Sequence, residues 1–182
     1  MFTRTQQDYL LALARNAIAA KLGGRSSPVS AQTDPVLQER RGAFVTLYRA
    51  GELRGCIGYI ESPFGLTETI EEVAVRSATQ DPRFPPVSAA ELDDLDIEIS
   101  VLSTPAEVSN VGDITIGVHG LIVESERRRG LLLPQVADER NWDRETFLRE
   151  TCRKAGLPPL SWKNPGTKIF SFTAEIIRAR HE

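Results

Sequence analysis

Alternation of apolar and polar residues predicts β-strands in several parts of the chain. Residues 42–49 are rich in β-forming side chains, Ala50-Gly51 allows the chain to reverse, and residues 53–59 complete a hairpin. Residues 95–101 alternate Leu, Ile, Ile and Val with acids and a serine, which is typical of a strand with one solvated face. Further strands are expected at 114–116, 120–125, 130–133 and 168–177, the last with four residues on one buried face: Phe170, Phe172, Ala174 and Ile176.

Helical spacing of apolar residues predicts three longer helices, at 4–22, 66–79 and from Asp143 to about residue 155. Thr5 with Asp8 resembles an N-terminal cap of the first helix, and Ser88 with Glu91 has the capping-box spacing of a short helix. Residues 26–34 are small and polar, so we expect a loop there. A hairpin, helices and strands in this order predict an α+β fold with mainly antiparallel sheet.

Composition adds bounds on size and partners. A chain of 182 residues fits one domain over 1–182, or two small subdomains that share it. The net charge of −3 argues against nucleic acid as a partner. No apolar run approaches the roughly 20 residues that span a bilayer, and no export signal opens the chain, so we expect a cytoplasmic protein without membrane attachment. The two cysteines, Cys56 and Cys152, are far apart, which argues against a zinc site and predicts free thiols.

Candidate chemistry concentrates on the second half of the hairpin. Strict alternation places Arg54, Cys56 and Gly58 on one face of the strand, with Arg54 about 7 Å from Cys56. At that separation a guanidinium can favour the thiolate. Gly55 and Gly58 indicate a close approach by a ligand or by another part of the backbone. A cysteine in a strand is equally compatible with a buried small apolar residue, and the sequence leaves both interpretations open.

The same stretch, Arg54-Gly55-Cys56-Ile57-Gly58, resembles the signature of the AMME chromosomal region protein family, known in prokaryotes as protein A of the AmmeMemoRadiSam system. The resemblance extends over nearly the whole chain through four further stretches: Asp81-Pro82-Arg83-Phe84-Pro85-Pro86, Val118-His119-Gly120-Leu121, Leu131-Leu132-Leu133-Pro134-Gln135, and Lys154-Ala155-Gly156-Leu157 followed by Trp162. It implies two intertwined α+β subdomains with a cleft between them. It also implies a pathway shared with a Memo-like protein and a radical-SAM protein, without identifying a reaction.

Three residues outside the hairpin are further candidates. His119 would complete a Cys-His pair of nucleophile and base, although a histidine at the edge of a strand is more often an ordinary hydrogen-bonding residue. Arg83 lies on a proline-rich loop that suits anion binding and a structural ion pair equally. Trp162 is a tentative part of the same ligand site, whereas His181 is penultimate and is not a candidate. The chain has no nucleotide-binding glycine motif and no metal-ligand spacing, so we assign no cofactor and no metal.

Two functional hypotheses follow. In the first, an enzyme or enzyme accessory binds a small molecule in a partly exposed cavity lined by Arg54, Cys56 and Arg83. In the second, an adaptor binds proteins such as the Memo-like and radical-SAM proteins, and the motifs serve the fold. We further expect the hairpin to lie inside its sheet and Tyr59 to pack on the helix at 66–79.

Overall fold

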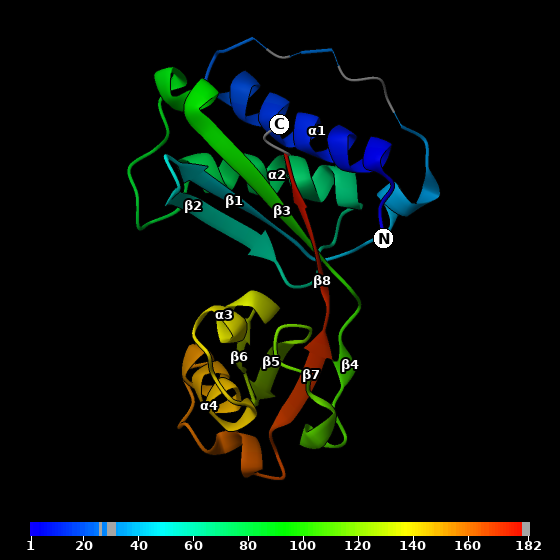
Figure 1. Cartoon of the computed structure of the whole chain (residues 1–182), viewed down its shortest axis with the longest axis vertical. Helices are drawn as coiled ribbons and strands as arrows, with labels where there is room; N and C mark the ends of the chain where they lie inside the picture. The colour runs from blue at the N-terminus through cyan, green and yellow to red at the C-terminus, as the bar shows by residue number, and fades with distance from the viewer. Residues whose placement is uncertain (26, 29–31, 180–182) are drawn as a thin grey trace. The chain divides into compact units, whose positions relative to one another are not determined.

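The computed structural model describes residues 1–25, 27–28 and 32–179, and they form two compact units (Figure 1). The first unit comprises Met1–Leu102 and Glu175–Glu182, and the second comprises Ser103–Ala174. The second unit is therefore inserted into the sequence of the first. The class is α+β with antiparallel pairing, as the sequence predicts. Part of the loop expected at 26–34 and the whole of His181 lie outside the described residues.

The first unit is a four-stranded sheet with two helices (Figure 1). The sheet has the strand order β2-β1-β3-β8, from Glu52–Tyr59, Ala43–Arg49, Leu95–Leu102 and Ala174–Arg178. Helices α1 (Arg4–Lys21) and α2 (Leu66–Thr79) pack on it, and η1 (Pro35–Gln38) and η2 (Ala89–Asp94) are short 3₁₀ turns. Its apolar core joins Leu10, Leu47, Ile70 and Ile99, among others.

Two expectations for this unit need correction. The hairpin is not wholly interior, because β1 is central but β2 forms an edge of the sheet. The cap of α1 is Thr3 with Gln6, not Thr5 with Asp8, although the helix begins at Arg4 as expected. Tyr59 does contact α2 as expected, since its hydroxyl donates to Glu72 Oε1 at 2.7 Å.

The second unit is also a four-stranded sheet with helices on it. Its strand order is β4-β7-β5-β6, from Ala106–Glu107, Lys168–Phe172, Gly120–Ser125 and Arg128–Leu132. Helices α3 (Pro134–Glu139) and α4 (Arg144–Lys154) and the turns η3 (Val111–Asp113) and η4 (Ser161–Lys163) complete it. Its core includes Leu121, Phe147, Leu148 and Ile169.

Two predicted strands of the later chain are wrong. Residues 114–116 form no strand, because the chain turns there, with Ile114 buried in the core and Ile116 packed against it. The expected strand at 168–177 is interrupted at Thr173, and its halves belong to different sheets: β7 to the second unit and β8 to the first. The interruption also changes the buried face, since Ile169, Phe172 and Ile177 are buried whereas Ile176 is exposed.

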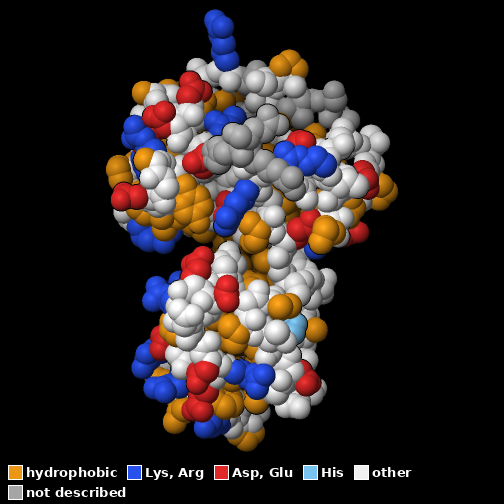
Figure 2. Space-filling view, viewed as in Figure 1, with side chains coloured by type: hydrophobic (Ala, Val, Ile, Leu, Met, Phe, Trp, Pro, Cys, Tyr) orange, Lys and Arg blue, Asp and Glu red, His pale blue; other side chains and the backbone are white. Residues whose placement is uncertain are grey.

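The surface carries mixed charge. On the face seen in Figure 2, acidic and basic side chains are interspersed on each unit, and neither sign forms a continuous patch. Among the described residues, no helix combines the length and the apolar character needed to cross a membrane.

Candidate functional site

Arg54 occupies an irregular position in the hairpin. On β2, Gly55 is paired with Leu47 and Leu53 with Tyr48, so Arg54 between them has no partner on β1. A residue inserted in this way bends the strand and redirects its side chain. Leu53, Cys56 and Gly58 consequently share one face of β2, which corrects the expectation that Arg54 belongs to that face.

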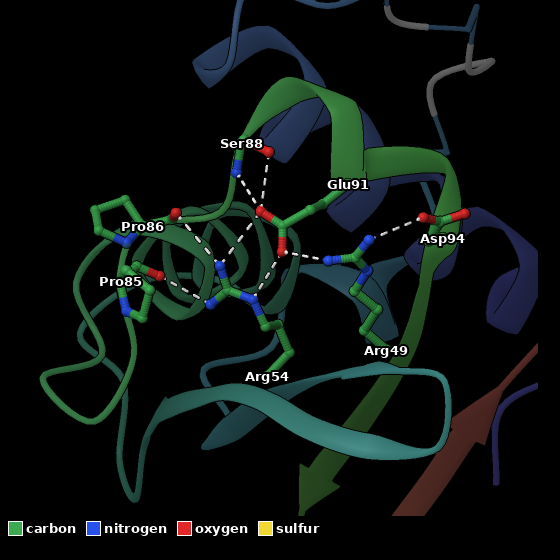
Figure 3. A network of polar contacts seen from close by, with 7 residues as sticks. All are labelled: Arg49, Arg54, Pro85, Pro86, Ser88, Glu91 and Asp94. Carbon is green, nitrogen blue, oxygen red and sulfur yellow. Dashed lines mark hydrogen bonds and ion pairs between the residues drawn. The ribbon is translucent and has the colours of Figure 1, made fainter.

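The redirected Arg54 side chain is held by η2 and by the proline loop (Figure 3). Its Nε lies 3.0 Å from Glu91 Oε1, and its Nη1 and Nη2 donate to the carbonyls of Pro85 and Pro86 at 2.8 and 3.3 Å. The two charged side chains are only 14% and 15% exposed. Arg54 therefore fastens two loops to the hairpin.

Glu91 is the common partner of Arg54, Ser88 and Arg49 in this network. Its Oε2 accepts hydrogen bonds from the backbone N–H and the hydroxyl of Ser88, at 2.8 and 2.9 Å, which completes the expected capping box. Arg49 Nη1 lies 3.3 Å from Glu91 Oε1, and Arg49 Nη2 forms an ion pair with Asp94. The hydrogen bond from Arg54 and those from Ser88 lower the pKa of Glu91 to about 2. The carboxylate is therefore ionised throughout the physiological range.

Cys56 lies on the opposite face from α2 and is partly exposed. Thr46, its partner on β1, donates a hydrogen bond to Sγ over 3.2 Å. Burial raises the pKa of the thiol, with smaller contributions from the carboxylates of Asp81 and Glu98, and the hydrogen bond from Thr46 and the charge of Arg83 only partly oppose this. The expected activation by Arg54 is therefore wrong, and the Cys56 thiol stays protonated at neutral pH.

Asp81 and Arg83 cover the outer edge of β2 at Cys56. Asp81 Oδ2 accepts the Cys56 backbone N–H at 2.9 Å, and Arg83 Nη2 lies 3.4 Å from the Cys56 carbonyl oxygen. The two side chains also pair with each other, with Arg83 Nη2 2.7 Å from Asp81 Oδ2. Together they satisfy backbone groups that an added strand would otherwise bind. The pairing with Arg83 lowers the pKa of Asp81, whose side chain is only 2% exposed.

The two glycines beside Cys56 allow close packing within the first unit. A Cβ at Gly55 would lie 2.2 Å from the Ser77 carbonyl oxygen, so the end of α2 lies directly against the backbone of β2. A Cβ at Gly58 would lie 2.4 Å from both the Ala43 carbonyl oxygen and the ring of Phe44. This packing accounts for both glycines without a ligand.

His119 and Trp162 belong to the second unit. His119 accepts the Thr115 backbone N–H on Nδ1 at 3.0 Å, which stabilises the turn before β5. Trp162 packs against the core of the second unit, and its buried Nε1 has no hydrogen-bond partner among the described residues. Their membership in one site with Cys56 stays a prediction.

Of the candidates, the structure brings Arg83 and Cys56 into contact and directs Arg54 elsewhere. The reasoning from sequence did not include Asp81, Glu91 and Thr46 among the site residues. Two of them were marked by a local signal, because Asp81 opens the Asp81-Pro82-Arg83 stretch and Glu91 closes the capping box. Thr46 carried no such signal, since its role depends on pairing between strands. The described residues contain no group of three or more His, Cys, Asp or Glu side chains placed to hold a metal ion.

A family model, sequence relatives and a solved structure each match most of this chain. The family model described as AMMECR1 matches residues 11–177. A protein of Methanothermobacter thermautotrophicus is 48% identical over 181 residues, which cover 96% of this chain and 94% of the relative. The crystal structure of uncharacterized protein PH0010 from Pyrococcus horikoshii is similar with a TM-score of 0.83 and 45% identity, covering 92% of this chain and 88% of that one.

Proposed function

The chain belongs to the AMMECR1 family, and we propose that it acts as a non-catalytic adaptor whose motif residues build a fixed docking surface. The observation that carries this proposal is the engagement of Arg54, whose guanidinium binds Glu91 and the carbonyls of Pro85 and Pro86. A side chain held on three sides in this way positions loops and is not available to activate a thiol. The contacts of Arg54 thus support a structural role for the Arg54–Gly58 motif.

The state of Cys56 supports the same proposal. A nucleophilic cysteine needs a lowered pKa or an adjacent base. Burial instead raises the pKa of Cys56, and the side-chain hydrogen bond that its sulfur receives comes from Thr46, whose hydroxyl is not a base at neutral pH. The thiol therefore contributes packing and polarity beside the edge of the sheet.

The surface that Arg54 and Glu91 hold in place is a shallow groove of about 650 Å³. Its apolar walls include Leu53 on the hairpin and Phe84, Pro85 and Pro86 on the loop, and we call it the hairpin groove. Leu53 is 38% exposed, so part of its apolar side chain is available to a partner. The two prolines and the ion pair limit the motion of the loop, so a partner would lose little conformational entropy on docking.

The partners we propose are the Memo-like protein and the radical-SAM protein of the same pathway, as the family resemblance implies. The test measures binding of the purified chain to each protein from the same organism by isothermal titration calorimetry. Leu53→Glu should weaken binding at least about tenfold, because it places a charge in an apolar contact. Leu160→Glu is the matched control, since Leu160 is also an exposed leucine but lies in the second unit, and it should bind as wild type.

Equal loss of binding by Leu53→Glu and Leu160→Glu would overturn the hairpin groove as the docking surface. If neither protein binds wild type, the adaptor proposal fails for this pathway. The Leu53→Glu variant must retain the wild-type circular dichroism spectrum for the comparison to hold.

A thiol enzyme is the second candidate, and the exposure of Cys56 beside Arg83 is the observation that favours it. The two candidates differ in how alkylation by iodoacetamide depends on pH. For an adaptor, the rate at Cys56 should still be rising at about pH 9, because the thiol pKa is above its ordinary value. A rate at Cys56 that reaches its plateau below neutral pH would favour the enzyme.

A further inference from the structure

We propose that the first unit binds a zwitterionic small molecule with an apolar body, such as an aromatic α-amino acid, in a cavity separate from the hairpin groove. The cavity has a volume of about 520 Å³ and lies among α1, β1, β3 and β8. That volume falls within the range of about 300–1,000 Å³ that is typical of small-molecule sites.

One wall of the cavity is apolar. Leu11 and Ala12 contribute it from α1, Ile97 adds to it from β3, and the ring of Tyr48 lines the cavity from β1. Leu11 packs against the edge of the core but, like Ala12, is only partly buried, unlike Leu10 and Ala14. The helix therefore leaves part of these two apolar side chains uncovered at the cavity.

Two arginines line the cavity, Arg15 and Arg178, and because Arg178 is paired with Glu98, the positive group left for a ligand is Arg15, one turn further along α1. Its Nη1 and Nη2 donate to the backbone carbonyls of Leu92 and Leu95 at 2.8 and 2.6 Å. These partners are neutral, and no carboxylate among the described residues forms an ion pair with Arg15. A guanidinium has five N–H donors, so three remain after these two bonds. Arg15 is thus held rigidly and keeps both charge and donors for an acidic group.

The negative group is Glu98 on β3, whose side chain is only 4% exposed. Its Oε2 accepts the Nε–H of Arg178, whereas its Oε1 accepts no hydrogen bond from a described residue. Asp96, two residues earlier on the same strand, adds a second carboxylate to the cavity wall. A nearly buried carboxylate with an unused oxygen is suited to an ammonium group.

An acidic group at Arg15, an ammonium group at Glu98 and an apolar body against Leu11, Ala12 and Tyr48 together describe the ligand class. Neither charge alone accounts for the cavity, because an anion would also meet the carboxylates and a cation would also meet Arg15. The site does not include Cys56 or the residues of the hairpin groove. Its occupancy is therefore independent of the docking function proposed above.

The test uses three probes that share a phenyl ring: L-phenylalanine, phenylacetate and phenethylamine. Each is titrated into the full chain while amide shifts are followed by ¹H–¹⁵N NMR. L-Phenylalanine should bind at least about tenfold more tightly than either singly charged probe, because it makes both charge-assisted contacts. The shifts should concentrate on the amides of Ala12, Tyr48 and Glu98, and not on those of Leu53 and Cys56.

Three variants separate the parts of the site. Ala12→Leu fills the cavity and should weaken L-phenylalanine binding about tenfold, whereas Ala20→Leu, at an exposed position of the same helix, should not. Glu98→Gln keeps an oxygen for Arg178 and should abolish the preference for L-phenylalanine over phenylacetate. Equal affinity of wild type for the three probes, no shift at the cavity at millimolar probe, or equal effects of Ala12→Leu and Ala20→Leu would each overturn the proposal.

Discussion

The two units share one packing device and differ in where they place their charges. In each, an edge strand carries a glycine against which the end of a helix packs: Gly55 of β2 against Ser77, and Gly130 of β6 against Ala155. In the first unit, three ion pairs have a largely buried carboxylate: the side chains of Asp81, Glu98 and Glu91 are 2%, 4% and 15% exposed.

The second unit leaves the acids of its ion pairs closer to water. Glu124, Glu150 and Glu145, which pair with Arg129, Arg153 and Lys163, are 40%, 26% and 57% exposed. Exposed pairs contribute little to stability, whereas breaking a buried one leaves an uncompensated charge. Buried charge therefore holds the loops of the first unit together, while the fold of the second rests on apolar packing.

Substituting the glycine that packs against a helix end in each unit should give the largest loss of stability. Gly55→Ala and Gly130→Ala each place a methyl group about 2.2 Å from backbone atoms of the facing helix, so each should lower the free energy of unfolding of its own unit by about 3 kcal/mol. Gly166→Ala meets no atom within 4 Å and is the control. Both tryptophans, Trp142 and Trp162, lie in the second unit, so denaturation followed by their fluorescence reports that unit.

Hydrogen exchange of the β1 and β5 amides separates the units further. Gly55→Ala should accelerate exchange in β1, and Gly130→Ala should accelerate it in β5. If either variant destabilises both units equally, the units are not independent and the comparison between them loses its basis.

The second prediction concerns the buried charge of the first unit. Glu91→Gln should lower the free energy of unfolding of this unit by about 2 kcal/mol, because it leaves the nearly buried Arg54 without its carboxylate. Hydrogen exchange of the η2 and β2 amides should accelerate. The unfolding transition of the second unit, followed by tryptophan fluorescence, should be the same as in wild type. Unchanged exchange in η2 would mean that the proline loop is held without the ion pair.

The third prediction is an acid sensitivity confined to the first unit. The pKa of Glu91 is lowered to about 2, mainly by Arg54, and the pKa of Asp81 is lowered in the same direction by Arg83. A lowered folded pKa contributes stability that is present above the unfolded value, about 4, and is lost as pH falls through the folded value. The first unit should therefore lose stability progressively between about pH 4 and pH 2.

The measurement is urea denaturation at a series of pH values, with exchange of β1 amides for the first unit and tryptophan fluorescence for the second. Asp143 of the second unit also has a lowered pKa through its helix cap, but it is fully exposed, so its contribution is small. Glu71 in the first unit has a raised pKa from burial and opposes the loss slightly. A steeper acid loss in the second unit would contradict the contrast between the units.

The smallest effect is expected from an exposed pair of the second unit. Glu150→Gln should change the free energy of unfolding by no more than about 0.5 kcal/mol, because Glu150 and Arg153 are both solvated. Chemical denaturation followed by tryptophan fluorescence measures it directly. A loss as large as that of Glu91→Gln would show that exposure does not distinguish the two networks.

Elements whose signal is local could be predicted from the sequence. The helices at 66–79 and after Asp143, the strand at 95–101 and the Ser88–Glu91 cap all follow from spacing within a few turns of chain, and the structure confirms them. The contact between Arg83 and Cys56 was also within reach, because both residues belong to recognisable stretches. In these cases the interacting groups are neighbours in sequence, or a motif marks both.

The direction of the Arg54 side chain and the division of residues 168–177 between two sheets depend on tertiary contacts. Strict alternation places Arg54 beside Cys56, but the register between β1 and β2 skips Arg54, and its carboxylate partner lies 37 residues away. Likewise, the alternating pattern from Lys168 to Ile177 would look the same in one long strand or in two strands of different sheets. Alternation records which residues are apolar, whereas register and sheet membership depend on backbone partners far away in the chain, which no local pattern can specify.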